Sequence, residues 1–146
     1  ETDTTFAPGK TCTRGQIVTF LWRANGEPEP ASAANPFTDV KAGDYYYKAM
    51  LWAKEKGITS GTDDTHFSPN AACSRAQAVT FLWRANGEPV GTGSTFGDVK
   101  DGEYYTEAVK WATGEGITAG DTSTTFAPNK NCTRGQIVTF LYRDKA

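Results

Sequence analysis

The chain has 146 residues, of which 38% are hydrophobic and 22% are charged, and its formal net charge at pH 7 is −2. This length suits one compact domain with its own core, since a domain near this size buries roughly 68–70% of the surface that its unfolded chain exposes. The slightly acidic balance and the scattered lysines and arginines argue against a nucleic-acid binder, and no apolar run approaches the roughly 18 residues of a membrane span.

Two blocks of sequence recur along the chain and define its organisation. The pattern Phe-x-Pro followed by Cys-Thr/Ser-Arg-x-Gln occurs three times, starting at Phe6, Phe67 and Phe126. The pattern Phe-x-Asp-Val, Tyr-Tyr, Trp-Ala and Gly-Ile-Thr-x-Gly occurs twice, starting at Phe37 and Phe96. Recurrence at nearly constant spacing indicates tandem supersecondary units.

The chain opens in the middle of a repeat, because Glu1–Thr5 aligns with Asp121–Thr125, the loop just ahead of the third Phe-x-Pro. We therefore predict a single domain over residues 1–146. It would comprise the second half of a first repeat (1–36), a second repeat (37–95) and a third repeat (96–146).

The first predicted helix starts at its N-cap Thr13 and ends at Asn25-Gly26. Thr13 and Gln16 match a capping box, in which a Ser or Thr N-cap and a Gln at N3 satisfy each other's backbone donors. Cys12 and Ile17 stand at the N′ and N4 positions of a hydrophobic staple. The residues beyond the cap are apolar over most of the helix circumference, which predicts deep burial. The capping box recurs as Ser74 with Gln77 and as Thr133 with Gln136.

A second kind of helix is predicted over Asp44–Lys56 and over the matching residues of the third repeat. Its apolar positions fall on one helical face: Tyr45, Ala49, Trp52 and Ala53. Asp44 offers a capping oxygen ahead of this helix, and Gly57 offers a left-handed stop after it.

Neither the loops nor the cysteines predict a metal site. Asp63-Asp64 lies in a turn-forming loop, but the third repeat keeps only Asp121 there, so a plain turn is favoured over a calcium loop. One cysteine stands at the same place in each repeat: Cys12, Cys73 and Cys132. Even together with His66 they lack the close-spaced ligand pairs of a structural zinc site, so buried apolar thiols are favoured. We predict no metal and no cofactor.

One arginine occupies the N1 position of each capped helix: Arg14, Arg75 and Arg134. This position is locally unfavourable for a cation, because the helix N-terminus carries partial positive charge. Two explanations stay open. The guanidinium bridges to a carboxylate or carbonyl of a neighbouring repeat, with Asp39 and Asp98 as candidate partners, or it joins the helix N-terminus in binding an anionic carboxylate or phosphate.

Aromatic side chains with flat apolar faces and polar tips suit a groove that holds a sugar ring. Tyr46 and Tyr105 are predicted to be the more exposed of these candidates. Trp52 and Trp111 are further candidates, although core packing is the favoured alternative for both because they lie on the apolar face of their helices.

The two blocks together resemble the S-layer homology repeat of bacterial surface proteins over nearly the whole chain. The resemblance implies a mainly α fold, with a pseudo-threefold domain of helix-loop-helix repeats around a central three-helix bundle. It also implies noncovalent attachment to an anionic secondary cell-wall polysaccharide, often bearing pyruvylated sugar, at the extracellular surface of a bacterium. Carried over to this chain, the groove arginines are Arg14, Arg75 and Arg134.

This sequence departs from the resembled family in three places. The usual Thr-Arg-Ala-Glu becomes Thr-Arg-Gly-Gln or Ser-Arg-Ala-Gln, so Gln keeps the capping bond but removes a negative charge beside the arginine. Cysteine stands where a larger apolar residue is usual. The first repeat lacks its Phe-x-Asp-Val helix, which leaves one groove open and predicts a homodimer in solution.

The leading functional hypothesis is therefore a noncatalytic module that anchors a protein to the cell wall. The alternative is a surface protein-interaction or lattice-forming module that binds no sugar. An enzyme is disfavoured, since the chain has one histidine, no repeated Ser or Cys in a nucleophile setting, and no close carboxylate pair outside its turns.

Overall fold

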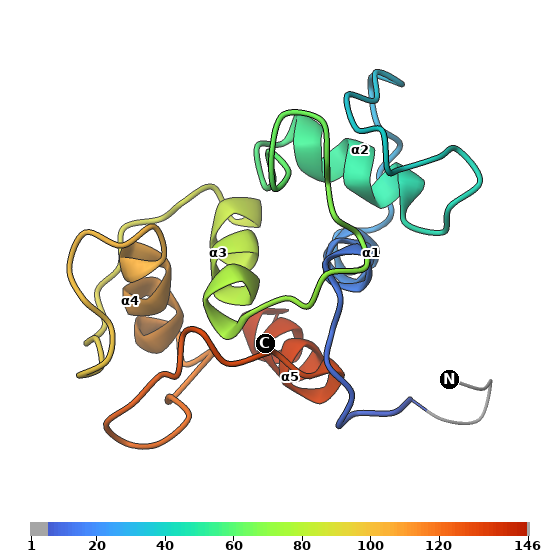
Figure 1. Ribbon diagram of the computed structural model, residues 1–146. Coiled ribbons are helices and arrows are strands. Elements are labelled where there is room, and N and C mark those ends of the chain that lie inside the picture. Colours follow the sequence, from blue (N-terminus) through green and yellow to red (C-terminus); the bar gives the residue numbers. More distant parts are fainter. Residues whose placement is uncertain (1–5, 146) are drawn as a thin grey trace. The chain divides into compact units, whose positions relative to one another are not determined.

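The computed structural model describes residues 6–145, so the predicted match of Glu1–Thr5 to the third-repeat loop lies outside the described residues. Five helices form within this range and are drawn in Figure 1: α1 (Arg14–Ala24), α2 (Tyr47–Glu55), α3 (Arg75–Ala85), α4 (Thr106–Gly114) and α5 (Arg134–Lys145). The predicted mainly α repeat fold is confirmed. No helix of residues 6–145 combines the length and the apolarity needed to cross a membrane.

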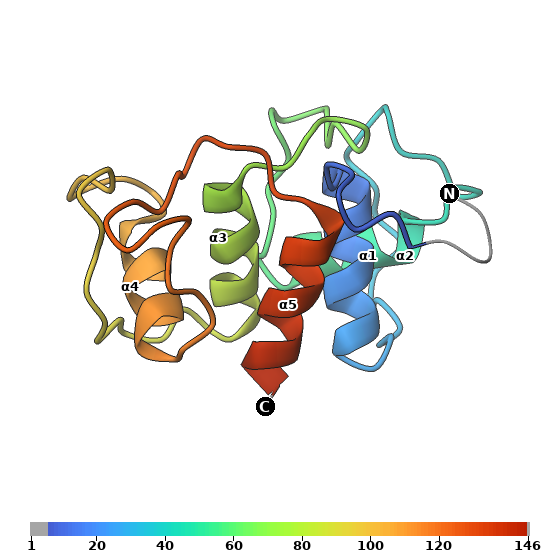
Figure 2. The ribbon, with the colours of Figure 1, turned by 90° about the horizontal axis from the view of Figure 1, so that it is seen from below.

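The described chain divides into two compact units that cut across the repeats. One unit is Thr13–Ala71, in which α1 packs against α2. The other joins the residues up to Cys12 with those from Ala72 onward, and there α3 lies between α4 and α5 (Figure 2). Each unit thus packs the capped helix of one repeat against the Phe-x-Asp-Val half of the next. The boundaries of the single domain and its repeats stay a prediction.

The capped helices α1, α3 and α5 begin where their sequences predict. Both hydrogen bonds of the capping box are present at Thr13 with Gln16 and at Ser74 with Gln77. Thr133 and Gln136 exchange the same two bonds ahead of α5, at 3.0 and 3.1 Å. Apolar side chains behind each cap are buried, among them Ile17, Val79 and Ile137, and their burial stabilises these short helices in the fold. In α5 the predicted deep burial is only partial, because Val138 is 40% exposed and Tyr142 is 77% exposed.

The helices α2 and α4 end as predicted but start three residues later than predicted, at Tyr47 and Thr106. The residues ahead of α2 form turns instead, because the Asp44 carboxylate accepts the Lys41 N–H at 2.8 Å and the Tyr47 N–H donates to the Asp44 carbonyl at 3.0 Å. Gly57 has φ of 74°, and the Ile58 N–H donates back to the Ala53 carbonyl at 2.8 Å, as in a Schellman stop.

This shift reverses the expected exposure of the paired tyrosines. Tyr45 is 60% exposed and Tyr104 is 53% exposed, whereas Tyr46 and Tyr105 are each 8% exposed. The prediction that Tyr46 and Tyr105 are the more exposed pair is wrong, because the pair precedes the first helical turn and does not follow the helical period. Each buried ring meets its exposed neighbour edge to face, at 4.9 and 5.0 Å between centroids.

The three cysteines meet in a closed ring of backbone hydrogen bonds. The Cys12 N–H donates to the Cys132 carbonyl at 2.8 Å, the Cys132 N–H to the Cys73 carbonyl at 2.8 Å, and the Cys73 N–H to the Cys12 carbonyl at 2.9 Å. All three cysteines are buried. Burial raises the pKa of Cys132 to about 11, although the nearby charge of Arg75 opposes this. The predicted role as buried apolar thiols is confirmed.

Candidate ligand-binding site

The first backbone N–H groups of the capped helices donate hydrogen bonds to acceptors within the fold. A helix leaves its first four N–H groups without intrahelical partners. At α3, Ser74 and Gln77 satisfy each other's N–H, the Arg75 N–H donates to the Lys130 carbonyl at 2.8 Å, and the Ala76 N–H donates to the Pro128 carbonyl at 3.0 Å. Of the alternative in which the arginine and the helix N-terminus bind an anion together, the backbone N–H groups at α3 are thus already bonded within the fold, and the guanidinium is the group left to bind an anion.

The N1 backbone N–H groups of the other two capped helices, α1 and α5, make matching hydrogen bonds. The Arg14 N–H donates to the Ala71 carbonyl at 3.0 Å, and the Arg134 N–H donates to the Lys10 carbonyl at 2.9 Å. In each copy the acceptor lies in the segment after Phe-x-Pro of another repeat. The helix starts are therefore held by tertiary contacts as well as by their own caps.

The three repeated arginines have one shared geometry. Arg75 Nε donates to the Phe126 carbonyl at 2.8 Å, and the guanidinium carbon lies 4.8 Å from the centre of the Phe126 ring. Arg14 and Arg134 make the same Nε bond, to the Phe67 and Phe6 carbonyls, both at 2.9 Å. All three arginines are buried, with Arg75 only 3% exposed. Each guanidinium thus bridges to a carbonyl of a neighbouring repeat, as the structural explanation expected.

The Asp98 carboxylate has a different partner from the one predicted. It accepts the Phe126 and Ala127 N–H groups, each at 2.8 Å, and it forms no ion pair with Arg75. Burial raises the pKa of Asp98, but the two N–H bonds and the charge of Arg75 lower it more, so the pKa lies below its usual range. Asp39 holds the Phe67 and Ser68 N–H groups in the same way.

Among residues 6–145, Arg75 has no carboxylate within ion-pair distance, and Nε makes its only hydrogen bond from the side chain. Burial lowers the pKa of Arg75, while the charges of Asp121 and Asp98 partly oppose this. Arginine nevertheless stays charged at physiological pH. Its two terminal amino groups therefore keep four N–H donors for a partner outside the described chain.

Arg75 lines a pocket of about 550 Å³, which we call the arginine pocket. Its polar lining residues come from α3, from the loop after α4, and from α5 with its N-cap: Arg75, Thr118, Asp121, Thr133, Gln136, Thr139 and Arg143. Two arginines thus converge on one opening. Gln136 stands near Arg134 in sequence, yet it contributes to the pocket of Arg75.

The predicted aromatic site residues lie elsewhere. Trp52 and Trp111 are each 5% exposed, on the packed faces of α2 and α4. Tyr46 lies against the start of α1, where a Cβ on Gly15 would come 3.0 Å from its ring. Burial, and then the hydrogen bond that the Tyr46 hydroxyl donates to Asp44, raise the pKa of Tyr46 to about 12. None of these four predicted residues lines the arginine pocket.

Sequence reasoning missed Arg143, although a signal for it was present. An arginine recurs nine residues after the N1 arginine in all three copies, as Arg23, Arg84 and Arg143. Only the third lines the arginine pocket among the described residues. Arg23 and Arg84 instead face Glu27 and Glu88 one helical turn on, at 3.9 and 4.0 Å.

The potential metal-ligating side chains form no metal centre among the described residues. Within the described chain, no group of three or more His, Cys, Asp or Glu side chains is placed to hold a metal ion. His66 contacts Asp63 at 3.0 Å in an exposed turn.

Comparison with known proteins shows the family to which the chain is related. The S-layer homology domain matches residues 36–79 and 95–138, more than half of the chain. The chain is 32% identical over 97% of its length to the amylopullulanase of Thermoanaerobacterium thermosulfurigenes, and 30% identical over 97% to the exoglucanase XynX of Acetivibrio thermocellus. It is 30% identical over 77% of its length to the surface-layer 125 kDa protein of Lysinibacillus sphaericus.

The chain spans only 8%, 13% and 10% of these three relatives. The two relatives named as enzymes therefore match through a small part of their length. Other relatives are named as a middle cell wall protein and a surface layer protein, from two Brevibacillus species. These matches place the chain at the bacterial cell surface, as the resemblance implied. The chain belongs to the S-layer homology domain family, whose members are noncatalytic modules that anchor surface proteins to the cell wall.

Proposed function

We propose that this module anchors its protein by binding an anionic secondary cell-wall polysaccharide, and that Arg75 in the arginine pocket is the main reader of the anionic group. Arg14 and Arg134 act in the same way at the other two copies of the motif. The ligand class is a polysaccharide that carries a carboxylate, such as a pyruvylated sugar.

The observation that carries this proposal is the charge balance at Arg75. A cation taken out of water loses hydration free energy, which a partner of opposite charge has to restore. Arg75 is 3% exposed, with no carboxylate of the described chain in ion-pair distance. An incoming carboxylate would pair with the terminal N–H groups in a bidentate manner, and Arg143 adds a second positive charge.

The pocket is also suited to binding without catalysis. Its uncharged polar groups among the described residues are the Thr118, Thr133 and Thr139 hydroxyls and the Gln136 amide, which can hydrogen-bond to sugar hydroxyls. No Cys, His or Lys side chain is among the described residues that line it. Its one carboxylate, Asp121, lies 3.7 Å from the Lys130 ammonium.

The test is co-sedimentation of the chain with purified cell-wall sacculi. Arg75→Lys keeps the positive charge but loses the planar fork of donors, so we expect retention to weaken at least tenfold. Arg84→Lys is the matched control, because it makes the same exchange on the same helix, at a half-buried position with its own Glu88 partner. It should weaken retention by less than twofold. Thermal melting of both variants checks that they fold.

Equal retention of Arg75→Lys and the wild type would overturn the role of Arg75. Sacculi stripped of their polysaccharide separate the proposal from its alternative. The anchor should lose binding to stripped sacculi, whereas a protein-interaction or lattice-forming module should keep it. The homodimer stays a separate prediction, which the mass of the chain in concentrated solution tests.

A further inference from the structure

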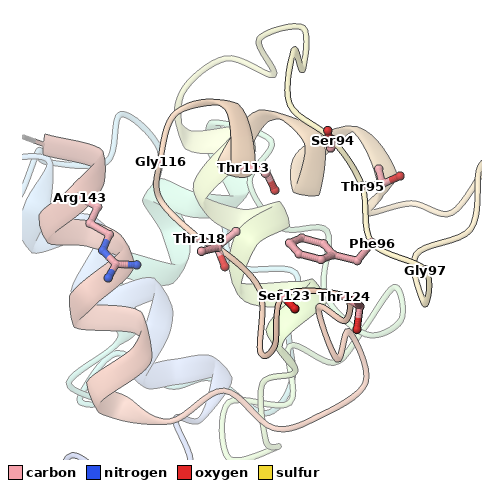
Figure 3. Close-up of a pocket in the computed structure, with 11 residues that line it drawn as sticks. Ser94, Thr95, Phe96, Gly97, Thr113, Gly116, Thr118, Ser123, Thr124 and Arg143 are labelled. Carbon is pink, nitrogen blue, oxygen red and sulfur yellow. The ribbon is translucent and has the colours of Figure 1, made fainter.

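A second and larger pocket of about 970 Å³ adjoins the arginine pocket (Figure 3). We call it the hydroxyl pocket. The two pockets share three lining residues: Thr118, Ala119 and Arg143. A ligand chain can therefore pass from one into the other without leaving the protein surface.

Among the described residues that line the hydroxyl pocket, Arg143 alone is charged. It presents side-chain hydroxyls from three segments: Ser94, Thr95, Thr113, Thr118, Ser123 and Thr124. The Phe96 ring is half-buried and points into the pocket from the side opposite Arg143 (Figure 3). None of the described residues that line it carries a carboxylate. An apolar ring with hydroxyls that donate and accept around it matches the faces and edges of a neutral sugar.

Arg143 forms the wall between the two pockets. Its Nη1 donates to the Ile117 carbonyl at 3.1 Å, which fixes the guanidinium beside Thr118. In Figure 3 the guanidinium reaches from α5 toward Thr118 and the Phe96 ring. The positive charge thus stands where an acidic sugar would join its neutral neighbour.

The hydroxyl lining is particular to the third repeat. The second repeat carries Lys54 and Asp64 at the positions of Thr113 and Ser123. Its Phe37, the counterpart of Phe96, is only 3% exposed. The motif shared by the repeats therefore does not account for this pocket.

We infer that the hydroxyl pocket is a second subsite that takes the neutral sugar next to the anionic one in the same polymer. This inference rests on the proposed function of the arginine pocket. The module then reads a unit of at least two sugars, with the carboxylate at Arg75 and the neutral ring against Phe96.

Calorimetry with two synthetic probes tests the inference. One probe is a pyruvylated monosaccharide, and the other is the disaccharide that adds one neutral hexose. We expect the wild type to bind the disaccharide about tenfold more tightly. Ser123→Trp should fill the hydroxyl pocket from an exposed loop position and abolish this gain, while the monosaccharide affinity stays within twofold. Gly43→Trp is the control, since Gly43 is exposed with open space around its Cβ position.

The outcomes separate the two claims. If the monosaccharide binds but the disaccharide gains nothing, or if the gain survives in Ser123→Trp, the second subsite is wrong and the arginine pocket stands. If neither probe binds the folded wild type, then the arginine pocket does not bind a pyruvylated sugar. The proposed second subsite is then wrong as well.

Discussion

The two connectors that lead into the Phe-x-Asp-Val segments follow the same nine residues, Phe20 to Pro28 and Phe81 to Pro89. Both copies close in the same way, with the Trp22 and Trp83 indole N–H groups donating to the Pro28 and Pro89 carbonyls at 2.9 and 2.8 Å. Beyond these prolines the two connectors are held differently. The same nine residues therefore lead to two different surfaces.

In the unit Thr13–Ala71 a side chain holds the connector. Glu55 Oε1 accepts the Ala31 and Ser32 N–H groups at 2.9 and 3.2 Å. The third repeat has Gly114 at the position of Glu55, and there the Gly93 backbone lies directly on α4, with its N–H donating to the Lys110 carbonyl at 3.1 Å. Close backbone packing thus sets the Ser94–Gly97 rim of the hydroxyl pocket. The repeated motif positions the arginines, whereas the connectors decide what surrounds them.

The largest expected effect comes from breaking the backbone contact of the third repeat. A Cβ on Gly93 would lie 2.6 Å from the Lys110 carbonyl oxygen and closer still to the Gly114 nitrogen. Since neither backbone atom can move freely, Gly93→Ala should lower the free energy of unfolding by about 2–3 kcal/mol, measured by urea denaturation. Gly43→Ala is the control and should change it by less than about 0.5 kcal/mol. An equal effect of the two variants would contradict the close packing.

A somewhat smaller loss is expected at Asp98, which holds two N–H groups in the loop ahead of α5. Asp98→Asn replaces one acceptor oxygen with a donor and should cost about 1–2 kcal/mol in urea unfolding. Asp39→Asn tests the same arrangement in the other unit, through the Phe67 and Ser68 N–H groups. If neither variant loses stability, these carboxylates do not hold the loops.

The same carboxylate predicts an acid dependence. The pKa of Asp98 is lowered in the fold, so its stabilisation is complete above the unfolded pKa of about 4 and disappears as the pH falls through the lower folded pKa. The wild type should therefore lose stability below about pH 4, and Asp98→Asn should lose less over that range. Urea midpoints at a series of pH values measure this, and parallel curves for both proteins would exclude the contribution.

Removing the side chain that holds the connector of the second repeat should lower the stability less. Glu55→Ala removes the acceptor of the Ala31 and Ser32 N–H groups, but both bonds are exposed and water can replace them. We expect a loss below about 1 kcal/mol in the same urea experiment. A loss as large as that of Gly93→Ala would mean that the two connectors do not differ in the way the contacts indicate.

The smallest effect concerns the charge of the arginine pocket. Gln136→Glu keeps the capping acceptor for the Thr133 N–H and adds a negative charge to the lining beside Arg75. Binding of a pyruvylated monosaccharide should weaken roughly threefold, because like charges repel weakly in a solvated pocket. Asn70→Asp adds the same charge at an exposed loop position and should leave the affinity unchanged. Salt should reduce the difference between these two variants.

The sequence predicted the features that depend on nearby residues. The capping boxes join residues three apart, and the Gly57 stop acts within one helical turn, so both could be found from spacing alone. The burial of the cysteines was predicted from their N′ position in a hydrophobic staple and from the lack of close-spaced metal ligands. The N1 arginine could be found because it recurs in every repeat. Arg143 recurs in the same way, but its spacing did not reveal its role in the pocket.

Other features depended on contacts that span half a repeat or more. Arg75 meets the Phe126 carbonyl 51 residues away, and Asp98 meets the Phe126 N–H 28 residues away, so their partners could not be assigned from local pattern. The exposure of Tyr46 was predicted wrongly because a turn ahead of α2 sets the direction of its ring. The sequence by itself determined the repeats, the caps and the placing of one arginine at each helix start, since these follow from local hydrogen bonding and periodicity. Only the tertiary structure decided which residues line the pocket at Arg75, because packing between repeats uses many of the polar groups and leaves others to face a ligand.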